Sequence, residues 1–101
     1  MTKKYIISDQ TQQDMEGIWW YIAQDNPAMA DKTSDAIYET YRMLADHPHI
    51  GHVRGDLTRR PLRFWALYDY LIIYDPRNNP IEIVHVLSDY RDLEKLLDDE
   101  L

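Results

Sequence analysis

Cysteine is absent from this chain of 101 residues, and glycine occurs only three times. The lack of cysteine excludes disulfides, thiolate zinc sites, iron–sulfur clusters and a cysteine nucleophile. Three glycines do not make a glycine-rich phosphate loop. No apolar run approaches the roughly 20 residues of a membrane-spanning helix. The apolar stretch Tyr5-Ile6-Ile7 is too short for the core of a signal peptide. We therefore expect a cytoplasmic protein.

The chain is rich in apolar residues and in negative charge. It is 45% hydrophobic and 12% aromatic, which is enough for one packed core. Its length predicts a single domain over residues 1–101. The formal net charge is −7. Because an acidic body repels phosphate backbones, general binding to nucleic acid is disfavoured.

Positive charge is concentrated in one segment. Within residues 51–63, a single acidic residue, Asp56, stands against four arginines: Arg54, Arg59, Arg60 and Arg63. Such a run is most often simply solvated, but guanidinium groups also form bidentate pairs with carboxylates. The segment is therefore a candidate contact for an acidic partner, and contact with RNA is the less favoured alternative.

The first half of the chain predicts a short strand and two helices. Tyr5-Ile6-Ile7 is typical of a strand, and an apolar stripe at helical spacing predicts a helix from Asp14 to Gln24. Asn26-Pro27 is a helix start, with asparagine as the N-cap and proline at the first helical position. The second helix should run to about Asp46. Because the link is so short, the two helices should form an antiparallel hairpin.

The second half predicts strands. After a polar loop from His49 to Arg60, short runs of aromatic and β-branched residues cover Leu62–Tyr68, Tyr70–Tyr74 and Ile81–Leu87. Ser88 can cap a final helix that carries Leu93 on its apolar stripe. The order is strand, two helices and three strands (βααβββ), followed by a C-terminal helix. This predicts an α+β fold with the hairpin packed on a small, mainly antiparallel sheet.

More apolar surface is present than such a small fold needs. Trp20 lies on the far side of the first helix from its apolar stripe. In the strands, Leu71, Ile73, Val84 and Val86 are predicted to face away from the other apolar residues, so that both sheet faces are apolar. Met29 and Met43 form a second stripe that equally well completes a wide core face. A large apolar surface of this kind usually marks an interface, unless the final helix covers it.

Several motifs occur in an order that resembles a known family. They are Asp14-Met15-x-x-Ile18-x-x-Tyr21, Asn26-Pro27-x-x-Ala30, Leu44-x-x-His47-Pro48-x-x-Gly51, Arg63 ahead of Tyr70-Leu71-Ile72-Ile73-Tyr74, and Ile83-Val84-x-Val86-Leu87 followed by Arg91-Asp92-Leu93. In this order they resemble the ParE branch of the RelE/ParE toxin superfamily, and the resemblance extends over about residues 5 to 97.

The resemblance implies the toxin half of a type II toxin–antitoxin module. ParE-like toxins act on DNA gyrase and block replication, and a ribbon-helix-helix antitoxin of the ParD kind neutralises them in a hetero-oligomeric complex. The surplus apolar surface suits a helix of such an antitoxin. The candidate antitoxin contacts are Trp20, Met29, Met43, Trp65, Leu71, Ile73, Val84 and Val86. The candidate target contacts are Arg54, Arg59, Arg60, Arg63 and Arg91.

Two positions depart from the family pattern. The chain has Tyr68-Asp69 where relatives often have a small residue followed by a basic one, and this difference can alter partner choice. It also has Ser88 where a histidine is often found, which argues against acid–base catalysis. Either change is compatible with an attenuated toxin.

The main alternative is an endoribonuclease of the RelE type, which needs a general base, a general acid and cations. His47, His49, His52 and His85 are the candidates for proton transfer, but three of them share one loop and His85 lies in a strand. The loop histidines also have no fourth ligand at metal-site spacing. Arg63 is singled out among the arginines because it begins a strand and matches the family's arginine, and an internal salt bridge to Asp56 or Glu82 is the alternative. We expect no catalytic residue, cofactor or metal, and a degenerate toxin that only binds antitoxin is the third hypothesis.

Overall fold

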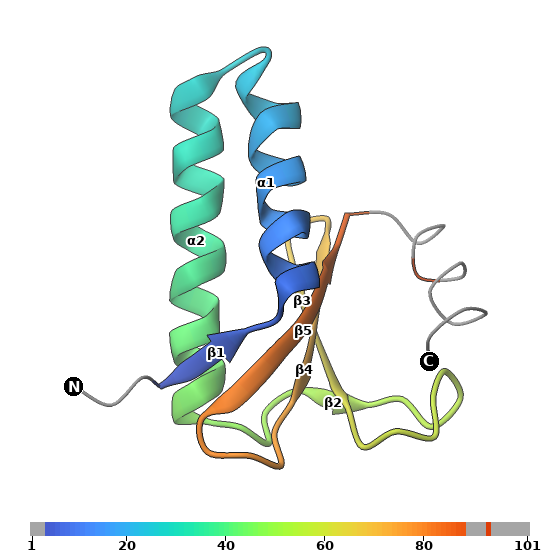
Figure 1. Ribbon diagram of the computed structural model, residues 1–101. Helices are drawn as coiled ribbons and strands as arrows, with labels where there is room; N and C mark the ends of the chain where they lie inside the picture. The colour runs from blue at the N-terminus through green and yellow to red at the C-terminus, as the bar shows by residue number, and fades with distance from the viewer. Residues whose placement is uncertain (1–3, 89–92, 94–101) are drawn as a thin grey trace.

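The computed structural model describes residues 4–88 and Leu93, and it shows two helices packed on one face of a five-stranded sheet (Figure 1). The strand order is β1-β5-β4-β3-β2. Strand β1 (Tyr5–Ile7) runs parallel to β5 (Ile81–Leu87), and the other neighbours are antiparallel. The predicted α+β class, with a helical hairpin on a small sheet, is confirmed.

Helix α1 spans Asp9–Ala23 and therefore begins five residues before the predicted start at Asp14. Ser8 is the N-cap, and its side chain accepts a hydrogen bond from the Thr11 amide. Such a cap satisfies an amide that has no partner within the helix. Helix α2 spans Pro27–Asp46 with Asn26 as its N-cap, as the sequence predicts.

The three long strands lie close to their predicted ranges. Strand β3 covers Arg63–Leu67 and strand β4 covers Tyr70–Asp75. The two-residue turn between them places Tyr68 at a φ of 54°. Strand β2 (His52–Val53) was not predicted. It lies in the segment expected to be a loop and pairs with β3.

A β-bulge in β5 changes the face on which its last residues lie. Tyr74 pairs with Ile83 and Ile73 pairs with His85, so Val84 is an extra residue between two regular pairs. One extra residue exchanges the two faces for everything that follows it. Val86 consequently packs beneath the helices with Ile83. The prediction that Val86 shares the outer face with Leu71 and Ile73 is wrong for this reason.

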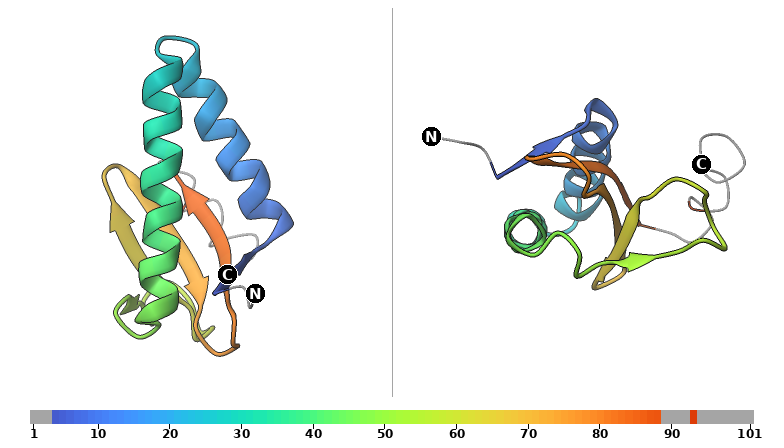
Figure 2. Two further views of the ribbon diagram at one scale, coloured as in Figure 1. Left: turned by 90° about the vertical axis from the view of Figure 1, so that its left-hand side faces the viewer. Right: turned by 90° about the horizontal axis from the view of Figure 1, so that it is seen from below.

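Two apolar cores lie on opposite faces of the sheet. The inner core, between sheet and helices, is made of Met15, Ile18, Ile37, Tyr41, Leu44, Ile72, Tyr74, Ile81, Ile83 and Val86. The outer core is made of Leu62, Phe64, Ile73, Leu87 and Leu93. The view from below shows the helices on one side of the sheet and the loop between β2 and β3 on the other (Figure 2).

The final helix is tested at one position. Leu93 is helical and 7% exposed, and it packs on the outer core as the predicted apolar stripe requires. The remainder of that prediction, residues 89–92 and 94–101, lies outside the described residues.

Candidate partner-binding surfaces

The start of α1 is fastened to the edge of β5. Strand β1 ends at Ile7, and the polar side chains that follow it form hydrogen bonds with the main chain of β5 in its place. The Thr11 hydroxyl donates to the Ile83 carbonyl oxygen at 2.9 Å. The Ser8 hydroxyl donates to the Val84 carbonyl oxygen at 2.9 Å. Asp14 Oδ2 accepts from the Val86 amide at 3.0 Å. These bonds fix where the rest of α1 lies relative to the sheet.

Asp14 also approaches His85, whose Nδ1 lies 3.4 Å from Asp14 Oδ2. Burial raises the pKa of Asp14, but the nearby His85 and the hydrogen bonds from the Val86 amide and Gln10 outweigh burial and leave this pKa below its ordinary value. His85 itself is 6% exposed. Its burial and its contact with Asp14 indicate a structural role at the edge of the sheet to which α1 is fastened.

The structure does not bring His85 to the loop histidines. The strand register places His85 opposite Ile73, Ile73 opposite Phe64, and Phe64 opposite His52. Three strand spacings of about 4.8 Å therefore separate His85 from His52 by roughly 14 Å. The His52 ring instead stacks on Trp65 at a centroid distance of 6.5 Å. Among the described residues, no group of three or more His, Asp or Glu side chains could hold a metal ion.

The outer face of α1 carries exposed aromatic rings. Trp20 is 66% exposed and Tyr21 is 78% exposed, so the prediction that Trp20 points away from the core is confirmed. Trp19 supports it: its indole donates to Asp31 Oδ1 at 2.9 Å, and its ring meets the Trp20 ring edge-on. Trp20 is thus held on the surface by a neighbour that is fixed to α2.

The other candidate antitoxin contacts differ in accessibility. Met29 is 47% exposed. Met43 and Trp65 are partly buried against the inner core, and Leu71 and Val84 are partly buried against the outer core. Ile73 and Val86 are 0% and 2% exposed. A partner therefore does not reach Ile73 or Val86 in this conformation, because the other residues of the outer core surround the former and the helices cover the latter.

The segment between β2 and β3, residues 54–62, is named here the arginine loop. Arg54 forms a two-pronged ion pair with Asp56, with nitrogen–oxygen distances of 2.9 and 2.8 Å. Arg59 and Arg60 are exposed. Leu57 packs against the outer core, and Thr58 is 7% exposed and accepts from the Arg60 amide. The loop is therefore anchored at its centre while its arginines face outwards.

Arg63, the arginine singled out as a target contact, forms hydrogen bonds within the fold. Its Nη1 donates to the carbonyl oxygens of His49 and Gly51 at 3.1 and 2.7 Å. The alternative of an internal salt bridge to Asp56 or Glu82 is not what the structure shows, because the turn after α2 brings carbonyl oxygens to the start of β3. Arg63 thus holds the turn in place. Arg91, the remaining arginine candidate, lies outside the described residues.

The same turn is held by Tyr74, whose role in it the sequence did not predict. The Tyr74 hydroxyl accepts from the Gly51 amide at 2.9 Å and donates to the Pro48 carbonyl oxygen at 2.8 Å. A Cβ on residue 51 would lie 2.5 Å from the Tyr74 hydroxyl oxygen, so this close approach requires glycine. Both Pro48-x-x-Gly51 and Tyr74 belong to the motifs quoted above, but their spacing does not reveal that they meet.

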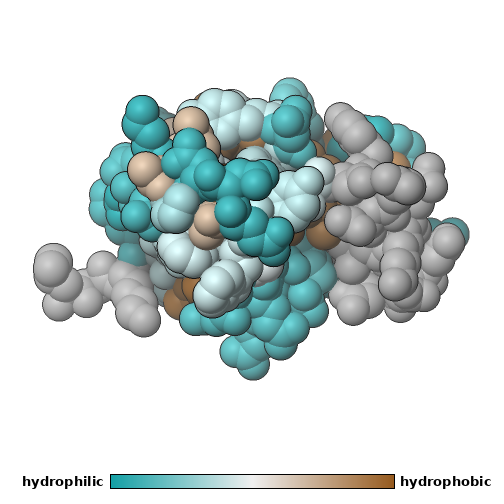
Figure 3. All heavy atoms as spheres, turned by 90° about the horizontal axis from the view of Figure 1, so that it is seen from above, coloured by the Kyte–Doolittle hydropathy of each residue, from teal (hydrophilic) through white to brown (hydrophobic). Residues whose placement is uncertain are grey.

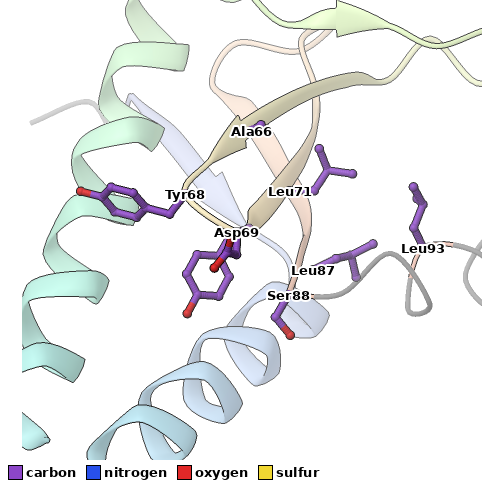
Figure 4. Close-up of a pocket in the computed structure, with 8 residues that line it drawn as sticks. Ala66, Tyr68, Asp69, Leu71, Leu87, Ser88 and Leu93 are labelled. Atoms are coloured by element: carbon purple, nitrogen blue, oxygen red, sulfur yellow. The ribbon is translucent and has the colours of Figure 1, made fainter.

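Two cavities meet at the end of the sheet near the β3–β4 turn. One, of about 280 Å³, is lined by Leu71, Leu87 and Leu93 and by the turn residues Tyr68 and Asp69 (Figure 4). The other, of about 750 Å³, is a groove between α1 and the turn. Asp69, Tyr70, Leu87 and Ser88 line both.

The described surface offers two candidate contacts, the exposed aromatic residues of α1 and the anchored arginine loop. The family model described as "ParE toxin of type II toxin-antitoxin system, parDE" matches residues 5–93, and the chain belongs to this family. The resemblance found in the sequence motifs is therefore confirmed.

A solved structure described as "Chromosomal ParDE TA system from P. aeruginosa" contains a similar chain. The TM-score is 0.66 at 19% sequence identity, and the match covers 81% of this chain and 90% of that chain. At this identity the likeness concerns the fold. Among curated proteins, no sequence matches the chain. No helix in the described part of the chain has the length and apolar character to cross a membrane.

Proposed function

We propose that this ParE-family toxin poisons DNA gyrase through protein–protein contact and that a cognate ribbon-helix-helix antitoxin, similar to ParD, neutralises it in the cytoplasm. Family membership over residues 5–93 carries the proposal. The toxin acts as a binding protein and breaks no bond of its own. The separation of His85 from His52 across the sheet supports this reading, because a general acid and a general base must both reach one substrate.

The arginine loop is the proposed contact for the target. On a chain of net charge −7, it presents Arg59 and Arg60 on a base fixed by Leu57 and Thr58. Arginine recognises carboxylates in a fixed two-pronged geometry, so an acidic surface of the target suits this loop. Arg63 serves as a positioning residue, since its guanidinium is occupied by the carbonyl oxygens of the preceding turn.

The test is inhibition of supercoiling by purified gyrase. The wild-type chain should inhibit supercoiling or trap cleaved DNA, and the double variant Arg59→Glu, Arg60→Glu should lose at least about tenfold in potency because it inverts the charge of the loop. Arg42→Glu, at an exposed arginine of α2, is the matched control and should remain potent. Intact supercoiling together with cleaved mRNA in translation extracts would instead identify the nuclease alternative.

The hairpin is the proposed contact for the antitoxin, with Trp20 at its centre. Replacing Trp20 by alanine should weaken the complex by about 2 kcal/mol, as interface tryptophans often do. The side chain is two-thirds exposed, so the melting temperature of the free toxin should change little. A drop in that temperature with unchanged affinity would show that Trp20 serves the fold. Tight antitoxin binding by a wild-type chain that arrests neither growth nor gyrase would identify the degenerate-toxin hypothesis.

A further inference from the structure

Arg77 is held in one orientation although its side chain is exposed. It lies just after β4, in the loop that leads to β5, and its guanidinium meets the carboxylate of Asp75, which is 5% exposed. Nε donates to Asp75 Oδ1 at 3.0 Å, and Nη2 donates to Asp75 Oδ2 at 2.7 Å. The Arg77 amide also donates to Oδ1, at 3.0 Å. A buried carboxylate therefore fixes one edge of an exposed guanidinium.

The second edge of this guanidinium, formed by Nη1 and Nη2, is available to a partner. A guanidinium has five N–H groups in a planar fork, and the bonds to Asp75 use only Nε and one N–H of Nη2. Apart from these bonds to Asp75, the Arg77 side chain forms no hydrogen bond or ion pair with the described residues, and it is 58% exposed. Its outer edge can donate two parallel hydrogen bonds to one further carboxylate or phosphate.

The arginine loop brings a second cation to the same aspartate. Strands β3 and β4 pair Arg63 with Tyr74 in an antiparallel register, which places Arg60 opposite Arg77 when it is continued by three residues. The charges agree with this placement. The hydrogen bond from Arg77 lowers the pKa of Asp75 most, and the positive charge of Arg60 lowers this pKa further. Two segments that are separate in the sequence thus gather arginines around one buried aspartate.

Positive charge is concentrated at the end of the sheet away from the hairpin tip, where the arginine loop and the β4–β5 loop both lie (Figure 1). Residues 54–63 and 75–77 together contain five arginines and two aspartates, which is a net charge of +3 on a chain of −7. The hairpin tip exposes Asp25, Asp31 and Lys32, and residues of near-neutral hydropathy lie there among strongly hydrophilic ones (Figure 3). The two ends of the molecule therefore differ in the sign of their charge.

The exposed arginines Arg59, Arg60 and Arg77, named here the arginine patch, suit a short acidic segment of a protein. Carboxylates and phosphates both match the guanidinium fork, so the charge beyond the patch decides between them. Since residues 54–63 and 75–77 hold +3 of a total of −7, the rest of the chain carries −10. A DNA duplex is a long polyanion that extends past the patch and is repelled by this charge. A short segment responds only to charges within roughly 10 Å at 0.1 M salt.

We propose that the arginine patch binds an acidic peptide segment of the toxin's target, with one carboxylate on the outer edge of the Arg77 guanidinium and neighbouring carboxylates on Arg59 and Arg60. Asp75 is a positioning residue, because it orients Arg77 from inside the fold and does not touch the partner. The inference rests on the proposed function for the identity of the target as gyrase. It adds the β4–β5 loop to the contact surface, and it makes the orientation of one arginine a determinant of binding besides charge.

The experiment measures binding of the purified whole chain to immobilised gyrase by surface plasmon resonance, together with inhibition of supercoiling. Arg77→Lys keeps the charge but loses the fork, so binding should weaken by about tenfold. Arg42→Lys is the matched control, because Arg42 is another exposed arginine paired with a carboxylate, that of Glu39, and it should bind as wild type. Thermal melts confirm that each variant is folded at the temperature of the assay.

Asp75→Asn separates orientation from charge. It makes the patch more positive by one unit, so a contact that depends on charge alone should become tighter. Loss of the orientation of Arg77 should instead weaken binding by about fivefold. Tighter binding by Asp75→Asn, or wild-type binding by Arg77→Lys, would overturn the inference. The proposed function would still stand in that case if Arg59→Glu, Arg60→Glu abolishes gyrase inhibition.

Two fluorescent probes, an oligoglutamate peptide and a DNA duplex, decide the inference if the wild-type chain leaves gyrase unaffected and the proposed target is thereby refuted. Peptide binding that weakens in Arg77→Lys but not in Arg42→Lys would support an acidic-segment site. Absence of peptide binding would overturn it. Preference for the duplex, lost in Arg77→Lys, would overturn it in favour of phosphate. Self-association of the wild-type chain that Arg77→Lys abolishes would overturn it in favour of a second copy.

Discussion

The Tyr74 hydroxyl offers a sharp test of how the turn after α2 is held. Tyr74 is fully buried, and its hydroxyl forms two hydrogen bonds with backbone groups of Pro48 and Gly51. Tyr74→Phe removes both bonds and leaves a buried amide without its acceptor. At about 1 kcal/mol for each bond, unfolding free energy should fall by roughly 2 kcal/mol. For a domain of this size that corresponds to a loss of roughly 10 °C in melting temperature.

Tyr41 provides the matched control, since it is also fully buried but its hydroxyl donates to the Met15 sulfur at 3.2 Å. A thioether is a weak acceptor, so Tyr41→Phe should cost less than about 1 kcal/mol. Urea unfolding followed by circular dichroism measures both variants. If Tyr41→Phe proves as destabilising as Tyr74→Phe, the cost comes from the loss of a buried hydroxyl as such, and the assignment of the turn to Tyr74 is refuted.

Three further predictions concern the sites described above. Gly17→Ala should raise the unfolding free energy by about 0.5–1 kcal/mol, because the added Cβ meets nothing within 4 Å; a decrease in urea melts would contradict the open groove. Arg63→Met should lower it by about 1–2 kcal/mol and increase hydrogen exchange of the turn after α2, whereas unchanged exchange would show that the two carbonyl bonds do not hold it. The hydrogen bond from Arg77 lowers the pKa of Asp75 more than burial raises it, so this pKa lies below its ordinary value. The ionised carboxylate therefore stabilises the fold above about pH 4, and this stabilisation is lost as the pH falls through the folded pKa. Asp75→Asn should therefore have a lower unfolding free energy than wild type at pH 7, and the two values should converge at acidic pH. A difference that does not change with pH would show that the charge of Asp75 is not the cause.

The sequence predicted the elements that follow a regular apolar spacing. Helix α2 matches from Asn26 to Asp46 because its cap, its proline and its stripe agree. The start of α1 was missed because its first residues face the polar edge of β5 rather than a core, and the segment Asp9–Gln13 accordingly shows no apolar stripe. The capping signal of Ser8 was the only mark of that start.

The bulge at Val84 was beyond the reach of periodicity. Alternation assigns faces only while every residue has one partner, and Ile81–Leu87 is apolar enough that either register reads as a buried strand. The role of Arg63 was missed for a related reason. Its partners are main-chain oxygens of the turn after α2, and such acceptors have no signature in the sequence.

The hydrogen bonds between α1 and β5 have a consequence for how this small protein avoids self-association. An edge strand with unpaired main-chain groups can pair with another chain, which leads to domain-swapped or fibrillar assemblies. Here the three-residue β1 covers only the first part of β5. Beyond it, the Ser8 and Thr11 hydroxyls and the Asp14 carboxylate occupy the vacant main-chain positions. Substitutions that remove these three side chains should therefore cause aggregation before they affect binding to a target.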